Sequence, residues 1–318
     1  MENGALVISL DFELLWGVFD KVDWREKQEY FQNTRELIPQ ILELFERYEI
    51  HCTWATVGML FNENWDDWNS NIPGVLPEYA NPNLSAYKYG KSIQSKETEK
   101  LCFAPEIIRK IKGNPGQEVG THTYSHYYCL EPGQTPGSFK ADLEKSGELA
   151  EKFGVELKSL VFPRNQYNQD YLELCRELNL DNVRTNPETW YWANVQEDSV
   201  QQKIFRTGDA YIGFNDKSYK DIPEIYPGIT GQKASRLLRP FTSILLLNNF
   251  RLKRIQSEMK TAAQRNEIYH LWWHPHNFGN KPFENLRDLQ IILDYYKKCQ
   301  KKYGFDSFTM KEVDNLNL

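Results

Sequence analysis

Two histidines four residues apart stand out as candidate metal ligands in this sequence. They are His122 and His126, at the ends of the segment HTYSH. Histidines with this spacing can lie on one face of a helical turn and share a divalent metal ion. The pair alone is equally compatible with two polar histidines that are hydrogen-bonded in a loop. Further ligands are therefore needed to favour a metal site.

An acidic pair could supply the missing ligand. Asp11 and Glu13 directly follow the apolar run 5–10. A carboxylate beside His122 and His126 completes a two-histidine, one-carboxylate site, which leaves positions open for water and substrate as catalytic zinc requires. One carboxylate could then bind the metal while the other takes a proton from a water molecule. A helix cap or a polar loop would also explain both acidic residues.

Arg164 and His274 are the candidates for two further catalytic roles. Arg164 follows Pro163 and could hold a catalytic carboxylate through two parallel hydrogen bonds. The alternative is a surface arginine after a turn proline. His274 ends the apolar run 268–273, where it could donate a proton to a leaving amine. His270 lies inside that run and is expected to point elsewhere.

Short apolar runs alternate with amphipathic segments along the chain, which predicts βα units and an α/β fold. Helices are expected over 33–48, 138–153, 169–178 and 285–303. Strands are expected over 5–10, 52–57, 118–121, 158–162, 182–185, 203–207 and 268–273. Six or seven such units favour a barrel, in which the carboxyl ends of the strands gather at one face. Every candidate residue follows a predicted strand, as this arrangement requires.

The sequence predicts a single domain over 1–318, with insertions at about 62–103 and 208–265. The second insertion contains a basic, apolar-rich stretch from Arg236 to Arg254. One hypothesis is that this stretch contacts a diphosphate or the inner surface of a membrane. An ordinary barrel helix with a solvated basic face is the alternative.

Composition narrows the class of protein. The chain has 318 residues, of which 40% are hydrophobic and 26% charged, as in soluble globular proteins. A net charge of −6 argues against nucleic acid as a partner, since binding phosphates needs a basic face. The 5 cysteines are scattered, which suits a reducing compartment. We find no signal-peptide pattern and no apolar stretch near the ~20 residues of a membrane span, so we expect a cytoplasmic protein.

The order of these motifs resembles the polysaccharide deacetylase family, also called the NodB-homology family or carbohydrate esterase family four. The resemblance runs from Leu6 to about His276. It rests on the acidic pair, the strand segment TWATVG at 53–58, the HTYSH segment, Pro163-Arg164 and the strand end LWWH at 271–274. The acidic pair has the D-x-E form, closer to a D-x-D subgroup whose last strand ends in His-Pro. The arginine-proline segment is partial, and Trp190 near Glu188 is the remnant of another motif.

The resemblance implies a distorted, TIM-like (β/α)7 barrel and a role for each candidate residue. Those roles are general base for Asp11, metal ligands for Glu13, His122 and His126, orientation of the base for Arg164, and general acid for His274. The implied cofactor is a divalent metal, with zinc favoured.

The implied reaction removes an acyl group from an N-acylated sugar. Without a signal peptide, a sugar nucleotide or a lipid-linked precursor of a surface polysaccharide is the expected substrate. Two alternatives remain. One is a different amide hydrolase or amide-exchange enzyme, such as a deformylase or a uronamide-directed enzyme. The other is a non-catalytic carbohydrate-binding barrel. The sequence does not indicate an oligomeric state.

Overall fold

A single curled sheet forms the centre of the protein. The computed structural model describes residues 3–187, 189–193, 200–212 and 217–314. In these residues the strand order is β6-β7-β5-β4-β3-β2-β1-β9-β8, and β10 pairs with β1. The strands are β1 (Ala5–Phe12), β2 (Cys52–Thr56), β3 (Gln117–Thr121), β4 (Ser159–Val161), β5 (Asn182–Thr185), β6 (Glu224–Tyr226), β7 (Ile229–Lys233), β8 (Arg236–Leu237), β9 (Ile268–Trp273) and β10 (Asp306–Phe308).

The pairing of the strands confirms the predicted α/β fold. Each named strand pair is parallel except β6 with β7. Strand β1 lies in the middle, its eight residues are all buried, and it pairs with β2, β9 and β10. The curled parallel sheet has two ends, β6 and β8, as expected for a distorted barrel. The carboxyl ends of its parallel strands point to the same face, where catalytic residues of barrels gather.

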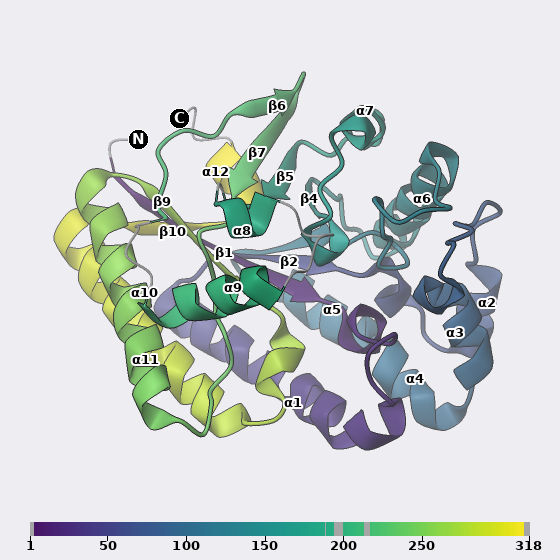
Figure 1. Ribbon diagram of the computed structural model, residues 1–318, viewed down its shortest axis with the longest axis horizontal. Helices are drawn as coiled ribbons and strands as arrows, with labels where there is room; N and C mark the ends of the chain where they lie inside the picture. Colours follow the sequence, from purple (N-terminus) through teal and green to yellow (C-terminus); the bar gives the residue numbers. More distant parts are fainter. Residues whose placement is uncertain (1–2, 188, 194–199, 213–216, 315–318) are drawn as a thin grey trace.

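Helices surround this sheet. Figure 1 shows α10 and α11 on one side of it and α2, α3 and α4 on the opposite side. The helices are α1 (Gln28–Tyr48), α2 (Trp65–Ser70), α3 (Ala86–Ile93), α4 (Lys96–Cys102), α5 (Pro105–Gly113), α6 (Pro136–Lys152), α7 (Leu172–Glu177), α8 (Trp190–Ala193), α9 (Val200–Ile212), α10 (Leu245–Arg265), α11 (Pro282–Tyr303) and α12 (Met310–Asp314). No helix in the described ranges combines the length and the apolarity needed to cross a bilayer.

Local sequence signals explain where the main helices begin and end. At the start of α6, the Thr135 side chain accepts a hydrogen bond from the Ser138 backbone, and Ser138 returns one. This reciprocal pair satisfies backbone groups that the first turn leaves unpaired. Helix α11 ends at Gly304, which has φ +68°, a conformation that glycine adopts without strain. The predictions for 33–48, 138–153 and 285–303 are confirmed by α1, α6 and α11.

The segment 62–103 folds into the short helices α2, α3 and α4, which pack on the start of the barrel. Trp68 lies at the centre of this packing. Its ring stacks on Trp16, with centroids 6.2 Å apart, and meets Trp65 edge-on at 5.4 Å. Gly90 allows this close approach, because a Cβ there would lie 2.9 Å from the Trp68 ring. The segment therefore contributes its aromatic residues to the core.

Two expectations for the later part of the chain need correction. The predicted strand over 203–207 lies inside helix α9. The next strand of the parallel sheet is instead β7, where Ile229, Gly231 and Gln232 are buried. The segment 208–265 is also more than an insertion, since it supplies β6, β7, β8 and α10. A short apolar run such as Ile204-Phe205 does not distinguish a strand from a helix by itself.

Candidate metal centre

Glu13 enters the site through a tight turn directly after β1. It precedes the 3-10 helix η1 (Leu14–Gly17), and Leu14 adopts φ +44°. The carboxylate folds back over this turn, so that a Cβ on Gly17 would lie 2.0 Å from the Glu13 carboxyl carbon. Glycine at position 17 therefore leaves the space that the Glu13 carboxylate occupies.

His122 and His126 meet this carboxylate from the loop that follows β3. The Nε2 atom of His126 lies 2.9 Å from Glu13 Oε2, and that of His122 lies 3.5 Å from the same oxygen. All three side chains are buried, and their ligand atoms lie within 4.8 Å of one another. The structure thus brings together the three residues that the sequence predicted as metal ligands.

The backbone between the two histidines differs from the expected helical turn. Thr123 and His126 have φ of +61° and +56°, in the left-handed region that a β-branched residue rarely adopts. The Thr123 hydroxyl stabilises this conformation by accepting a hydrogen bond from the Tyr127 amide at 2.7 Å. The histidines therefore converge through a strained loop, a geometry that is typical of functional sites.

Asp142, on α6, binds the backbone of this loop. Its carboxylate accepts hydrogen bonds from the backbone amides of Tyr124, at 2.6 Å, and Ser125, at 3.1 Å. The Ser125 hydroxyl donates a further bond. Asp142 is nevertheless so deeply buried that its pKa is raised to about 6. The strained loop thus depends on a buried carboxylate that lies outside the cluster of ligands.

The hydrogen bond at the far side of the His122 ring fixes its orientation. His122 Nδ1 lies 2.8 Å from the Val161 carbonyl oxygen. Because a carbonyl only accepts, His122 Nδ1 must carry a proton, so a neutral His122 presents its Nε2 lone pair towards Glu13. His126 Nδ1 lies 3.1 Å from the Tyr128 hydroxyl. Such outer partners hold metal-binding histidines in the correct tautomer and ring orientation.

The charges of these groups fit a divalent cation. Burial alone raises the pKa of Glu13, but the nearby His274 and His126 outweigh it and place that pKa well below its ordinary value. Burial lowers the pKa of His126 to about 4. Glu13 Oε2 is buried and has no hydrogen-bond partner among the described residues. A bare carboxylate oxygen facing two imidazole nitrogens is the donor set expected for zinc with open positions.

Asp11 lies beside this centre and is held by Arg184, on β5. Two parallel hydrogen bonds of 2.7 Å join Arg184 Nη1 to Asp11 Oδ1 and Arg184 Nη2 to Asp11 Oδ2. The guanidinium lies over the Trp272 ring, 4.3 Å from its centroid. Burial raises the pKa of Asp11, but the charges of Arg184, His122 and His274 together outweigh it, so the pKa lies below its ordinary value. Asp11 is therefore ionised and firmly oriented.

The prediction that Arg164 orients Asp11 is wrong. Arg164 forms an ion pair with Asp20, and its guanidinium lies 4.3 Å from the centroid of the Tyr128 ring. Its backbone has φ +54° in a short turn after β4, which directs the side chain away from Asp11. The sequence did contain a signal for Arg184, since a charged residue in the middle of a buried strand needs a buried partner.

Two histidines after β9 complete the site. His274 Nε2 lies 3.4 Å from Glu13 Oε1 and 3.6 Å from Asp11 Oδ2, and the His274 side chain is 26% exposed. The structure thus places His274, the predicted general acid, beside both carboxylates, whereas the sequence analysis assigned no role to His276. His276 is buried, and its Nδ1 atom lies 3.8 Å from Glu13 Oε1 without a hydrogen-bond partner in the described part of the chain. The histidine-proline-histidine sequence was the available signal.

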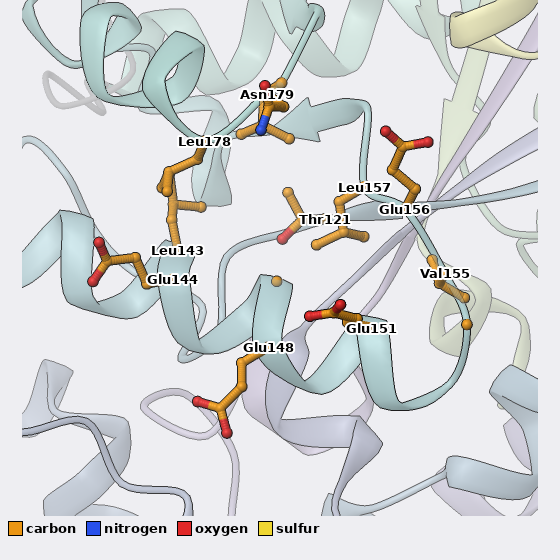
Figure 2. Close-up of a pocket in the computed structure, with 13 residues that line it drawn as sticks. Thr121, Leu143, Glu144, Glu148, Glu151, Val155, Glu156, Leu157, Leu178 and Asn179 are labelled. Carbon is orange, nitrogen blue, oxygen red and sulfur yellow. The ribbon is translucent and has the colours of Figure 1, made fainter.

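A cavity of about 670 Å³ lies elsewhere, between α6 and the segments around β4. Figure 2 shows Thr121 between α6 and the segment that carries Leu157. None of the ligands, Asp11 or His274 lines this cavity. Its size alone does not make it the reaction site, because the titratable groups that could do chemistry converge at the metal centre.

Comparison with known proteins agrees with this geometry. The family model for polysaccharide deacetylases matches residues 15–183. A candidate polysaccharide deacetylase from Mycobacterium smegmatis superposes with a TM-score of 0.60 and 14% identity, covering 98% of this chain and 89% of that one. A second candidate polysaccharide deacetylase, from Pseudomonas aeruginosa PAO1, superposes with a TM-score of 0.57 and 10% identity, covering 98% of this chain and 88% of that one. The α-amylase AmyC from Thermotoga maritima superposes with a TM-score of 0.59 and 11% identity, covering 99% of this chain and 75% of that one. No curated protein matches the chain.

These matches differ in what they cover. The three structures are distant in sequence and therefore indicate a common fold. The matched range of the family model includes His122 and His126 but ends before Arg184 and begins after Asp11 and Glu13. The assignment of Asp11 and Glu13 to the site therefore rests on the contacts of their side chains described above.

Proposed function

Because the chain belongs to the polysaccharide deacetylase family, we propose that it is a metal-dependent hydrolase that removes an acyl group from an N-acylated sugar. One observation carries the proposal. Glu13 Oε2 and the Nε2 atoms of His122 and His126 face one another, and the oriented carboxylate of Asp11 lies beside them. This arrangement supports the proposal of a metal site and a base in the same buried space.

The cation would be held by Glu13, His122 and His126. We propose zinc, because two imidazoles and one carboxylate form a donor set that zinc prefers in catalytic sites. The bound cation would supply Lewis acidity, which polarises the acyl carbonyl and makes a nearby water more acidic.

The residues around the cation divide the proton transfers. Asp11 accepts a proton from the water that adds to the acyl carbon, and Arg184 keeps its carboxylate ionised and aimed. His274 donates a proton to the sugar nitrogen as the carbon–nitrogen bond breaks. The products are a carboxylic acid and a free amine. Of these groups His274 is the most exposed, so we expect the substrate to enter on its side.

One half-buried aromatic ring near His274, that of Trp192, supports a sugar as the substrate, whereas Trp272 is itself buried with Arg184 over its ring. The Trp272 ring lies 5.6 Å from that of His274, between centroids, and the half-buried Trp192 packs edge-on against Trp272 at 6.2 Å. Indole rings suit the apolar faces of sugars while offering a polar N–H. A sugar nucleotide or a lipid-linked precursor stays the proposed form of the substrate, and the cytoplasm the proposed location.

The stretch from Arg236 to Arg254 does not form the basic face that would favour a lipid-linked substrate at a membrane. Arg236 is buried against Glu258, which Arg254 also contacts, and Arg251 is buried against Asp288. These arginines are held inside the fold and do not form a basic face. Any membrane contact would instead use the exposed apolar side chains at the start of α10, which include Ile244, Leu245, Leu246 and Phe250.

Sedimentation with lipid vesicles tests this contact. We expect the protein to pellet with phosphatidylglycerol-containing vesicles, and we expect Leu245→Asp to abolish pelleting because a carboxylate opposes insertion of the apolar turn. Val75→Asp is the matched control, since Val75 is also an exposed apolar residue. No pelleting of the wild type at low salt would remove the membrane proposal and leave the sugar nucleotide.

Release of acetate and formate from a panel of N-acylated sugar nucleotides tests the reaction itself. Asp11→Asn should retain the metal without turnover, and His126→Ala should lose both. Fewer than about half a metal ion per purified chain would count against the enzyme, because open sites of this kind normally bind zinc well. Near-normal activity of Asp11→Asn would contradict the assignment of the base.

A further inference from the structure

Two buried polar side chains, those of Ser9 and His270, form a hydrogen-bonded chain that ends on Arg184. Ser9 precedes Asp11 by two residues on β1 and so shares its face of the sheet. His270 lies on the neighbouring strand β9, where it is paired with Val7. Ser9 and His270 are both completely buried. Neither residue has a place among the metal ligands or in the proposed proton transfers.

Hydrogen bonds connect these residues to Arg184. Arg184 Nη1 donates to Ser9 Oγ at 3.0 Å, and Ser9 Oγ lies 2.8 Å from His270 Nε2. Ser9 Oγ accepts from Arg184 and keeps its own hydroxyl proton to donate. The relay proposed below directs this proton at His270 Nε2, which places the proton of a neutral His270 on Nδ1.

The surroundings of His270 keep it a neutral acceptor. Burial, followed by the neighbouring Arg184 charge, lowers the pKa of His270 to about 3. His270 Nδ1 has no hydrogen-bond partner among the described residues. A buried nitrogen without a partner destabilises a fold, so packing alone would favour an apolar side chain at position 270. A role in which the ring must accept a hydrogen bond explains why a histidine can be useful there.

That role concerns the guanidinium of Arg184, which donates nearly all of its N–H hydrogens to hydrogen bonds. Nη1 donates to Asp11 and Ser9, and Nη2 donates to Asp11 and Asn165. A serine hydroxyl without an acceptor could turn its proton towards Arg184, and the bond would be lost. By accepting the Ser9 proton, His270 keeps a lone pair of Ser9 directed at Nη1.

We propose that Ser9 and His270 are positioning residues, which lock Arg184 in the orientation that aims the Asp11 carboxylate. The proposal depends on the proposed function, in which Asp11 is the general base. The relay acts through Arg184 only, and it touches neither the substrate nor the cation.

A pair of substitutions at position 270 tests the relay. The amide oxygen of His270→Gln can reach the place of Nε2 and accept the Ser9 proton, whereas the shorter His270→Asn cannot. We expect His270→Gln to keep kcat within about threefold of the wild type. His270→Asn and Ser9→Ala should lower kcat by at least about tenfold, because a base displaced by a fraction of an ångström works poorly. KM and zinc content should stay unchanged.

Other outcomes overturn the relay. Equal kcat for His270→Asn, Ser9→Ala and the wild type would show that Arg184 needs no such support. A loss in His270→Gln equal to that in His270→Asn, with equally lowered melting temperatures, would show a packing role. An inactive wild type would contradict the proposed function. The relay can still be tested in that case, because the ¹⁵N spectrum of His270 does not depend on activity. In ¹⁵N spectra of the wild type, His270 should be neutral with its proton on Nδ1, and a proton on Nε2 would refute the relay directly.

Discussion

Substituting Gly17 by alanine should disable the metal centre while leaving the fold intact. The added Cβ would lie 2.0 Å from the Glu13 carboxyl carbon and 2.2 and 2.4 Å from its two oxygens. An ordinary contact of ~3.4 Å would require the carboxylate to move by about 1.4 Å, whereas metal–ligand distances tolerate only about 0.2 Å. Gly17 does not adopt a positive φ, so alanine adds no backbone strain at that position.

The expected loss of zinc affinity follows from the displacement of one ligand. Changes to residues that merely support ligands weaken metal binding by about 10- to 100-fold. Displacing Glu13 itself should therefore weaken zinc binding by at least about 100-fold, which corresponds to about 2.8 kcal/mol. Because only the end of a flexible side chain has to move, we expect the thermal unfolding of the apoprotein to change little.

Competition with a chromophoric chelator measures the zinc affinity, and the visible spectrum of the cobalt-substituted protein reports the ligand set. Gly74→Ala is the matched control, since a Cβ there would meet no atom within 4 Å. We expect Gly74→Ala to bind zinc as the wild type does. Wild-type affinity and an unchanged cobalt spectrum in Gly17→Ala would refute the placement of Glu13 as a ligand.

Three further predictions concern charged residues. Arg184→Lys should lower kcat about 100-fold with unchanged metal content, because lysine cannot form the paired hydrogen bonds, whereas Arg164→Lys should stay within about twofold. Burial raises the pKa of Asp142 to about 6, so stability from its protonated form is lost as the pH rises through 6. Urea titrations from pH 4 to 7 should show the wild type losing about 3 kcal/mol relative to Asp142→Asn, and parallel curves would contradict this. Glu258→Gln should reduce the unfolding free energy by about 3 kcal/mol, because it leaves Arg236 buried without its counter-charge. A change below about 1 kcal/mol in urea denaturation would count against that pair.

The proposed metal ligands could be predicted from the sequence because two of them follow a strand directly and His126 lies in the same short loop as His122. Glu13 comes one residue after β1, and His122 comes immediately after β3. In a parallel sheet these ends meet at one face, so the order of the chain is enough to bring the side chains together. The exact backbone was not predictable. Thr123 and His126 have positive φ values, and the residues between them are bound by the Asp142 carboxylate, which belongs to α6, the next α-helix along the chain.

The partner of Asp11 could not be predicted from neighbouring residues. Strand β5 lies four places from β1 in the sheet, and Arg184 reaches Asp11 only because the sheet curls round on itself. The curvature is a property of all the strands together, and no local motif encodes it. Arg164 was a reasonable candidate by position in the chain, but its left-handed backbone turns the side chain towards Asp20.

The proposed metal ligands and the Asp11–Arg184 pair are therefore held in place by different parts of the fold. Substitutions should be able to disrupt either one without the other. Glu13, His122 and His126 are held by turns next to their own strands, whereas Asp11 is held across the interior of the barrel by Arg184. A chain of this fold that lost Arg184 would still bind a cation but would have a poorly aimed base. It would then behave as a metal-binding, non-catalytic barrel. An intact Asp11–Arg184 pair is thus the feature of this structure that argues for catalysis over binding alone.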